Sequence, residues 1–167
     1  EGADAIGGLI AQVDALPDYD AAPLDPSQPQ KGTVHGVLMG MEGAAAAAYF
    51  PAFAALLADE WQPMFTKRVK RPPTDPVNAL LSYGYVLLTN QVAAAAQIVG
   101  FDPYIGYLHS TQYGKPALAL DMVEMFRAPI VDSVVLSLLN NRMLTPSDFE
   151  EAFGAWRMNE NARRTFL

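Results

Sequence analysis

The chain of 167 residues contains no cysteine, so several kinds of chemistry are excluded at once. There is no disulfide, no thiolate zinc site and no cysteine nucleophile, which agrees with a reducing cytoplasm. No signal peptide opens the chain, and it carries no glycine-rich phosphate loop and no internal repeat. What is present is 51% hydrophobic and 10% aromatic. That composition excludes general disorder and predicts one domain with a substantial core.

Positive charge is scarce as well. The net charge of −7 argues against simple nucleic-acid binding. However, the first 25 residues hold six acids and no Lys or Arg, and the rest of the chain has 12 acidic against 11 basic residues. The dense basic cluster is either a solvated loop or a loop that contacts DNA phosphates. Its members are Lys67, Arg68, Lys70 and Arg71.

Charge is absent altogether from Pro76 to Phe101. The length of this run raises the possibility of a membrane span, but its polar side chains favour a central buried helix. Thr74 or Asp75 would cap that helix and Pro76 would open it. A polar stripe recurs at helical spacing, and it either satisfies itself in the core or orients metal ligands. The stripe consists of Asn78, Ser82, Tyr85 and Thr89.

The remaining pattern predicts an all-α fold: a multi-helix domain, residues 1–167, around that central buried helix. No hairpin turn separates the Val-rich patches, so no strands are predicted. Helices are expected over residues 1–16, 34–61 with a kink at Pro51, 117–127, 129–140, a short one opened by Thr145 to Asp148, and a last one capped by Asn159. Loops are expected at 17–33 and 62–74, which are rich in proline.

Two acids in an otherwise apolar helix need an explanation. Asp121 and Glu124 are three residues apart and so share a helix face. His109 lies in the turn before this helix and can fold back over it. Small residues on the same face, Ala117 and Ala128, leave room for an ion and a ligand. Because carboxylates seldom enter a buried face unless paired or metal-bound, these residues indicate either a metal site or a solvated acidic face.

Glu42 is the fourth candidate ligand. It is the one charge in a long apolar stretch and has glycine next to it at position 43 and nearby at position 40. Glycines weaken a helix and are often tolerated for close approach of backbone or ligand. The residues alone leave two alternatives open, a ligand or an exposed Glu.

Together, these segments resemble a known family: the CRISPR-associated integrase, the endonuclease subunit of the spacer-acquisition complex. The matching strings follow one another in the order and spacing of that family, over roughly residues 36–145. They are Met39-Gly40-Met41-Glu42-Gly43 with Tyr49-Phe50, Arg71 to Tyr85, Gly106 to Ser110, Gly114-Lys115-Pro116, and Leu118 to Arg127.

The resemblance implies a fold and a reaction. Such prokaryotic proteins have an N-terminal β-domain and a helical catalytic domain, form homodimers, and assemble with a small ferredoxin-like companion subunit. They join short foreign double-stranded DNA fragments into a CRISPR array by metal-dependent transesterification. The metal ligands that it implies are Glu42, His109 and Glu124, with Asp121 as a supporting acid. Mg²⁺ or Mn²⁺ is the expected ion.

Two departures from the family pattern are visible. Basic residues usually follow the position of Gly43, but here Ala44 to Ala48 follow it. The chain also lacks room for the β-domain, so we interpret it as an excised catalytic domain or part of a fusion. Two hypotheses result. In the first, an enzyme uses the metal, with Asp121 positioning a ligand or accepting a proton and Lys115 stabilising phosphate charge. In the second, the chain is a non-catalytic helical scaffold.

Overall fold

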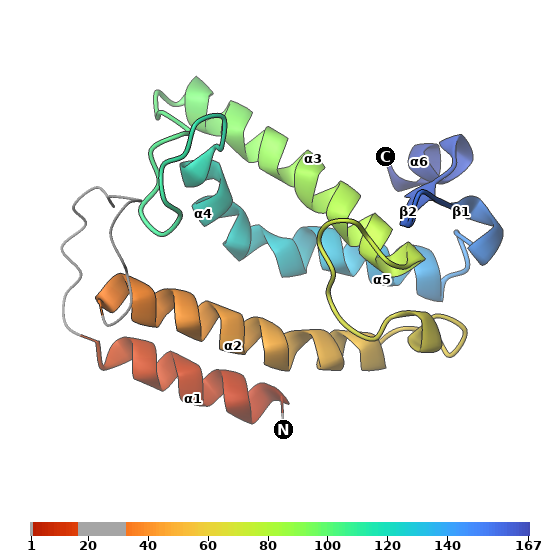
Figure 1. Ribbon diagram of the computed structural model, residues 1–167, viewed down its shortest axis with the longest axis horizontal. Coiled ribbons are helices and arrows are strands. Elements are labelled where there is room, and N and C mark those ends of the chain that lie inside the picture. Colours follow the sequence, from red (N-terminus) through yellow and green to blue (C-terminus); the bar gives the residue numbers. More distant parts are fainter. Residues whose placement is uncertain (1, 17–32) are drawn as a thin grey trace. The chain divides into compact units, whose positions relative to one another are not determined.

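A computed structural model of the chain describes residues 2–16 and 33–167 (Figure 1). An all-α fold was predicted, and the fold is mainly helical, with one short antiparallel hairpin in addition. The elements are α1 Gly2–Asp14, α2 Val34–Ala55, η1 Gln62–Met64, α3 Pro76–Ile98, α4 Ala117–Phe126, η2 Arg127–Asp132, α5 Ser133–Asn140, η3 Pro146–Asp148, β1 Phe149–Ala152, β2 Ala155–Met158 and α6 Glu160–Phe166. The loop expected at 17–33 lies outside the described residues, apart from Thr33.

The chain divides into two compact units. Unit 1 comprises residues 1–52 and 89–124, and unit 2 comprises residues 53–88 and 125–167. The expected single domain stays a prediction. All candidate metal ligands fall in unit 1, and the basic cluster falls in unit 2.

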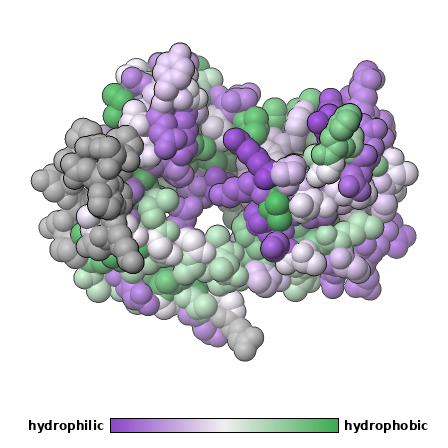
Figure 2. Space-filling view, in the orientation of Figure 1, coloured by the Kyte–Doolittle hydropathy of each residue, from purple (hydrophilic) through white to green (hydrophobic). Residues whose placement is uncertain are grey.

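In unit 1, α1 runs alongside α2 in the opposite direction (Figure 1). The hydroxyl of Thr33 accepts the N–H of Gly36 at 3.1 Å and so caps the start of α2. Alanine-rich α2 is largely exposed, and weakly apolar side chains cover it in Figure 2. Among the described residues, α2 is also the helix whose length and composition would suffice to cross a membrane, a test that core helices of soluble proteins pass too.

The C-terminal end of α2 differs from the prediction. The helix contains Pro51, as expected, but it ends at Ala55 instead of continuing to Trp61. The side chain of Asn140 accounts for this end. Its Nδ2 donates to the carbonyl of Leu56 at 2.8 Å, and its Oδ1 accepts the N–H of Ala58 at 2.7 Å. The side chain of Asn140 therefore supplies both backbone groups with hydrogen bonds that a longer helix would otherwise provide.

The helix α3 begins as predicted. Asp75 Oδ1 accepts the N–H of Asn78 at 2.7 Å, and Pro76 occupies the first helical position. Residues 76–81 are fully buried, whereas residues 97–100 are exposed. Gly100 ends the helix with φ +91°, and the N–H of Phe101 donates back to Ala96. The predicted central buried helix is thus correct for its first turns and wrong for its last.

Unit 2 holds the large buried side chains. Trp61 is completely buried and its ring meets Phe149 edge-to-face, while Phe53 meets Phe65 in the same way. The aliphatic part of this core comes from α3 and α5. Its fully buried members are Val77, Leu80, Leu81, Val135 and Leu139. In unit 1 the most buried apolar residues of the described part are small, namely Ala96, Ala117, Ala119 and Val123.

The two helices predicted on either side of Pro129 form one continuous path. Between α4 and α5 the backbone widens into the π-helical segment η2, which contains Pro129. A proline removes one hydrogen-bond donor and crowds the preceding turn, and a π-turn is a recognised way to absorb such a disruption. Pro129, which was predicted to begin or kink a helix, thus lies inside a π-helical segment, and α5 ends at Asn140 as predicted.

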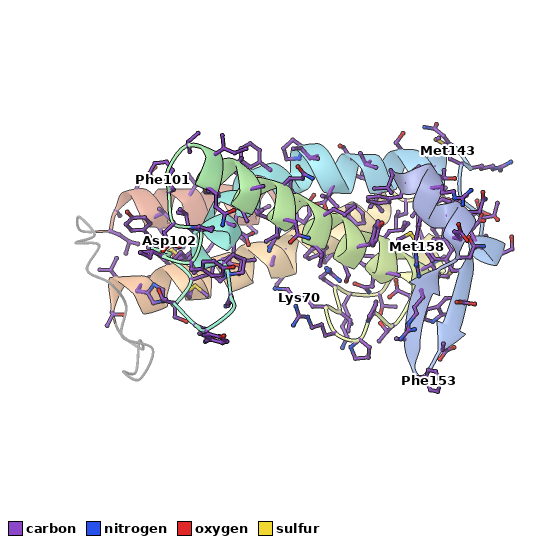
Figure 3. The ribbon with its side chains drawn as sticks, turned by 90° about the horizontal axis from the view of Figure 1, so that it is seen from above. Lys70, Phe101, Asp102, Met143, Phe153 and Met158 are labelled. Carbon is purple, nitrogen blue, oxygen red and sulfur yellow. The ribbon has the colours of Figure 1, made fainter. Side chains whose placement is uncertain are left out.

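The C-terminal hairpin was not predicted. Strands β1 and β2 pair in register from Phe149 with Met158 to Ala152 with Ala155. Phe153 and Gly154 form the turn with φ of 56° and 72°, the pattern of a type I′ turn. Figure 3 shows Phe153 at the tip. Asn159 caps α6 as predicted, accepting the N–H of Ala162 at 2.8 Å.

Candidate metal centre

A carboxylate holds His109 against α4. The ring Nδ1 of His109 lies 2.7 Å from Oδ1 of Asp121, and the same oxygen accepts the backbone N–H of His109 at 2.8 Å. The other oxygen accepts the N–H groups of Tyr107 at 2.6 Å and Leu108 at 3.0 Å. A histidine that donates Nδ1–H to a carboxylate leaves Nε2 as the acceptor, which is the form that binds metal. The expectation that His109 folds back over the helix is confirmed.

Two opposing effects act on the Asp121 carboxyl. Burial by itself would raise its pKa, but the N–H groups of Tyr107 and Leu108, with the ring and N–H of His109, stabilise the ionised form more. The pKa of Asp121 therefore lies below its usual range. Both carboxylate oxygens of Asp121 already accept hydrogen bonds, so this residue is better suited to positioning His109 than to accepting a proton. Of the two roles that the sequence suggested for Asp121, positioning a ligand is therefore favoured.

The loop before α4 contacts the first turn of that helix at two points that precede His109. The carbonyl of Pro103 accepts the N–H of Leu118 at 3.0 Å, in the first turn of α4. Gly106 passes so close to the helix that a Cβ there would lie 2.6 Å from the Cβ of Ala117. The room expected beside Ala117 is therefore filled by the loop backbone and not by an ion, because only glycine permits this approach.

The two candidate glutamate ligands lie on different helices. Glu124 lies one turn beyond Asp121 on α4, and Glu42 lies in the middle of α2. Oε2 of Glu42 is shielded from solvent and has no hydrogen-bond partner among the described residues. A buried carboxylate oxygen without a donor is costly, and a cation would satisfy it.

The described side chains do not yet form a closed ligand set. Within residues 2–16 and 33–167, no group of three His, Cys, Asp or Glu stands at metal-holding geometry. The convergence of Glu42, His109 and Glu124 on one ion therefore stays a prediction. The chemistry of the donor set still fits Mg²⁺ or Mn²⁺, which prefer carboxylate oxygens, with an imidazole acceptable to Mn²⁺.

Lys115 is placed by a tight turn directly before α4. Its N–H donates to the carbonyl of Gln112 at 3.0 Å, and Gly114 adopts φ +72° between them. Glycine takes this left-handed conformation without strain. Lys115 is half-buried and stands two residues before Ala117, the first residue of α4.

Three members of the polar stripe on α3, namely Asn78, Ser82 and Tyr85, form their described hydrogen bonds with groups other than the candidate metal ligands. Asn78 and Ser82 bond to the basic loop, and the hydroxyl of Tyr85 donates to Asp132 at 2.6 Å. These contacts all lie within unit 2, so they favour the alternative in which the polar groups satisfy one another in the core.

Comparison with known proteins decides the family. The profile of the family described as CRISPR associated protein Cas1 matches residues 21–167. The chain belongs to the Cas1 family. The CRISPR-associated endonuclease Cas1 3 of Thermus thermophilus is 51% identical over 130 residues, which cover 78% of this chain and 39% of that protein. The chain thus spans well under half the length of this relative.

Solved structures agree with the family assignment. A partial Cas6-RT-Cas1–Cas2 complex matches with a TM-score of 0.80 at 29% identity, over 99% of this chain and 46% of that one. A casposase bound to integration product matches with a TM-score of 0.74 at 26% identity, over the same shares of the two chains. The fold described here is accordingly that of the helical part of Cas1 proteins.

Sequence reasoning missed one residue of this centre. Gly106, which lets the His109 loop lie against α4, was noted only as part of the family string. The sequence did contain a signal for it, because a glycine three residues before a candidate ligand indicates a close approach of the backbone.

Proposed function

We propose that this chain is the metal-binding catalytic part of an integrase that joins short double-stranded DNA fragments into a CRISPR array. The observation that carries the proposal is the 2.7 Å contact of His109 Nδ1 with Asp121, which leaves Nε2 of His109 available as a metal ligand. Glu124 follows Asp121 by one turn on α4. Family membership supports the reaction class. The Thermus relative is named an endonuclease, and one structural neighbour is named for its bound integration product.

In this proposal, Glu42, His109 and Glu124 hold one Mg²⁺ or Mn²⁺ ion. When bound, such an ion polarises a phosphate and favours attack by a 3′-hydroxyl. Asp121 keeps the proton of His109 on Nδ1 and so keeps Nε2 available for the ion. Lys115 stabilises negative charge on the reacting phosphate.

The proposed assembly contains a second copy of this protein, a small ferredoxin-like companion subunit and DNA, in the cytoplasm of a prokaryote. The structural match to a component of a complex named with Cas2 supports the companion. The chain by itself is expected to bind DNA weakly and to integrate weakly, since the acidic N-terminal segment repels phosphate.

Metal titration of Glu124→Ala tests the centre. Loss of a carboxylate ligand should lower the affinity for Mn²⁺ at least about tenfold, measured by calorimetry on the purified chain. The matched control is Glu151→Ala, which removes the same charge from an exposed position on the hairpin. Equal Mn²⁺ affinity of parent and Glu124→Ala would overturn the metal centre.

The same variants separate the enzyme from the non-catalytic scaffold. In a metal-dependent strand-transfer assay with the companion subunit, Glu124→Ala should lose joining while its DNA binding stays largely intact. Metal binding with no joining by the parent protein in its complete assembly would favour the scaffold.

A further inference from the structure

The four cations of the basic cluster are not equivalent in the structure. Lys67, Lys70 and Arg71 are exposed, but Arg68 turns inward and is half-buried against α3. Figure 2 shows hydrophilic side chains gathered over this loop, and Figure 3 shows Lys70 extending from it. The cluster therefore combines three outward charges with one inward charge.

The amide of Asn78 ties the loop backbone to α3. This side chain is completely buried. Its Oδ1 accepts the N–H of Val69 at 2.8 Å and Nη1 of Arg68 at 2.8 Å. Its Nδ2 donates to the carbonyl of Lys67 at 2.9 Å and to Oδ2 of Asp75 at 2.5 Å. Both lone pairs and both N–H groups of the amide are thus in use.

Arg68 adds a second connection between the loop and the helix. Its Nη1 also donates to the carbonyl of Val69 at 2.7 Å, and its Nη2 donates to the hydroxyl of Ser82 at 3.1 Å. The guanidinium lies 5.3 Å from the ring centroid of Tyr85, in a cation–π contact. Burial lowers the pKa of Arg68 from its usual value, but an arginine stays charged at neutral pH. Three of its five N–H groups thus bond inside the protein, and Nε is shielded from solvent.

Ser82 completes the attachment. Its hydroxyl accepts from Arg68 and donates to the carbonyl of Lys70 at 3.5 Å. Backbone groups of residues 67, 69 and 70 are thus tied to one face of α3. A loop held in this way loses little conformational freedom when a ligand binds the side chains that it presents.

We propose that loop 67–71 is a preformed docking site for the phosphate backbone of double-stranded DNA. Lys67, Lys70 and Arg71 contact phosphates, while Asn78, Ser82 and Arg68 are positioning residues that hold the loop in shape. The inference rests on the proposed function for the identity of its ligand. The docking site goes beyond the proposed function because it needs no metal and because it assigns Arg68 of the loop, together with Asn78 and Ser82 of α3, a role in DNA affinity.

A double-mutant cycle tests the positioning role. The probe is a fluorescent DNA duplex of about 30 base pairs, titrated at several salt concentrations without divalent metal. Lys70→Gln should weaken binding about three- to tenfold and reduce the salt slope by about 1. Ser82→Ala removes no charge, so it should weaken binding about threefold and leave the salt slope unchanged. In the Lys70→Gln background, Ser82→Ala should have a clearly smaller effect, because it acts through Lys70.

Arg68→Lys separates positioning from direct contact. The substitution keeps the charge but loses the forked contacts to Asn78 and Ser82, so binding should weaken as in Ser82→Ala. The control is Ser137→Ala on α5, which removes a hydroxyl that accepts from Asn141 at 3.1 Å and lies outside the loop. Helix content and unfolding midpoint, measured for every variant, identify any general loss of fold.

Three outcomes would overturn the proposal. They are parent-like binding by Arg68→Lys, full additivity of Ser82→Ala with Lys70→Gln, and absence of salt-dependent binding by the parent chain. None of these affects the Mn²⁺ affinity that tests Glu124. A failure of the docking site is therefore distinguishable from a failure of the metal centre.

Discussion

Replacing Asp121 by asparagine keeps the shape of the side chain and removes one acceptor oxygen. The native carboxylate serves two sets of donors, Tyr107 and Leu108 on one oxygen and His109 on the other. An amide has one oxygen and one NH₂ group, so the NH₂ group must face either the N–H groups of Tyr107 and Leu108 or the groups of His109. If the NH₂ faces His109, Nδ1 becomes an acceptor and the proton moves to Nε2, which can then no longer bind metal.

The magnitude of this change follows from the bonds that are lost. If the NH₂ faces the loop instead, two backbone N–H groups lose a charged acceptor, and each such bond contributes about 1.5–3 kcal/mol. Tyr107 is exposed, which lowers the sum, so we expect a loss of about 2–3 kcal/mol in the free energy of unfolding. In either orientation the affinity for Mn²⁺ should fall about 10- to 100-fold.

Urea unfolding followed by circular dichroism and Mn²⁺ calorimetry measure the two effects. The matched control is Asp102→Asn in the same loop, where Oδ1 accepts the N–H of Tyr104 at 2.9 Å. Asparagine suits this turn as well as aspartate does, so stability should change by less than about 0.5 kcal/mol. If Asp121→Asn loses no more stability than the control and binds Mn²⁺ like the parent, the reasoning is wrong.

Two further predictions concern packing and pH. Gly84→Ala places a Cβ 2.5 Å from Cγ1 of Val131, so it should lower the free energy of unfolding by about 1–3 kcal/mol. The Cβ of Gly7→Ala on α1 meets nothing within 4 Å, so this variant should gain up to about 1 kcal/mol. Similar urea midpoints for the two variants would contradict this. Hydrogen bonds from Thr145 lower the pKa of Asp148, so its stabilising effect is present above the unfolded pKa of about 3.9 and is lost as pH falls through the lower folded pKa. The difference in melting temperature between the parent and Asp148→Asn should therefore shrink from pH 7 to about pH 3, and a constant difference would refute it.

Features built from neighbouring residues were predictable from the sequence. The cap of α3 by Asp75, the cap of α6 by Asn159 and the capping box at Thr145 each join residues three apart. Such bonds depend on residue type and spacing alone. The approach of His109 to α4 was predictable for a similar reason, because a short loop joins His109 to the helix that carries Asp121.

Features that need distant partners were not predictable. The end of α2 is set by Asn140, which lies 82 and 84 residues from the groups that it bonds. The hairpin turn at Phe153 has φ 56°, a conformation that a bulky side chain rarely adopts, so Gly154 was its one local signal. For the predicted metal centre, the sequence indicates the ligand types, and whether Glu42 on α2 converges with Glu124 on α4 depends on tertiary packing.

The positions of the two tryptophans have a practical consequence. Trp61 and Trp156 are the chain's whole tryptophan content, and both belong to unit 2. Intrinsic tryptophan fluorescence therefore follows the unfolding of the unit that carries loop 67–71, while unit 1, with Glu42, His109 and Glu124, contributes no tryptophan signal. Circular dichroism detects helix in both units. Coincident transitions by the two probes would show that the units unfold together, and an earlier loss of helix signal would show that unit 1 unfolds first.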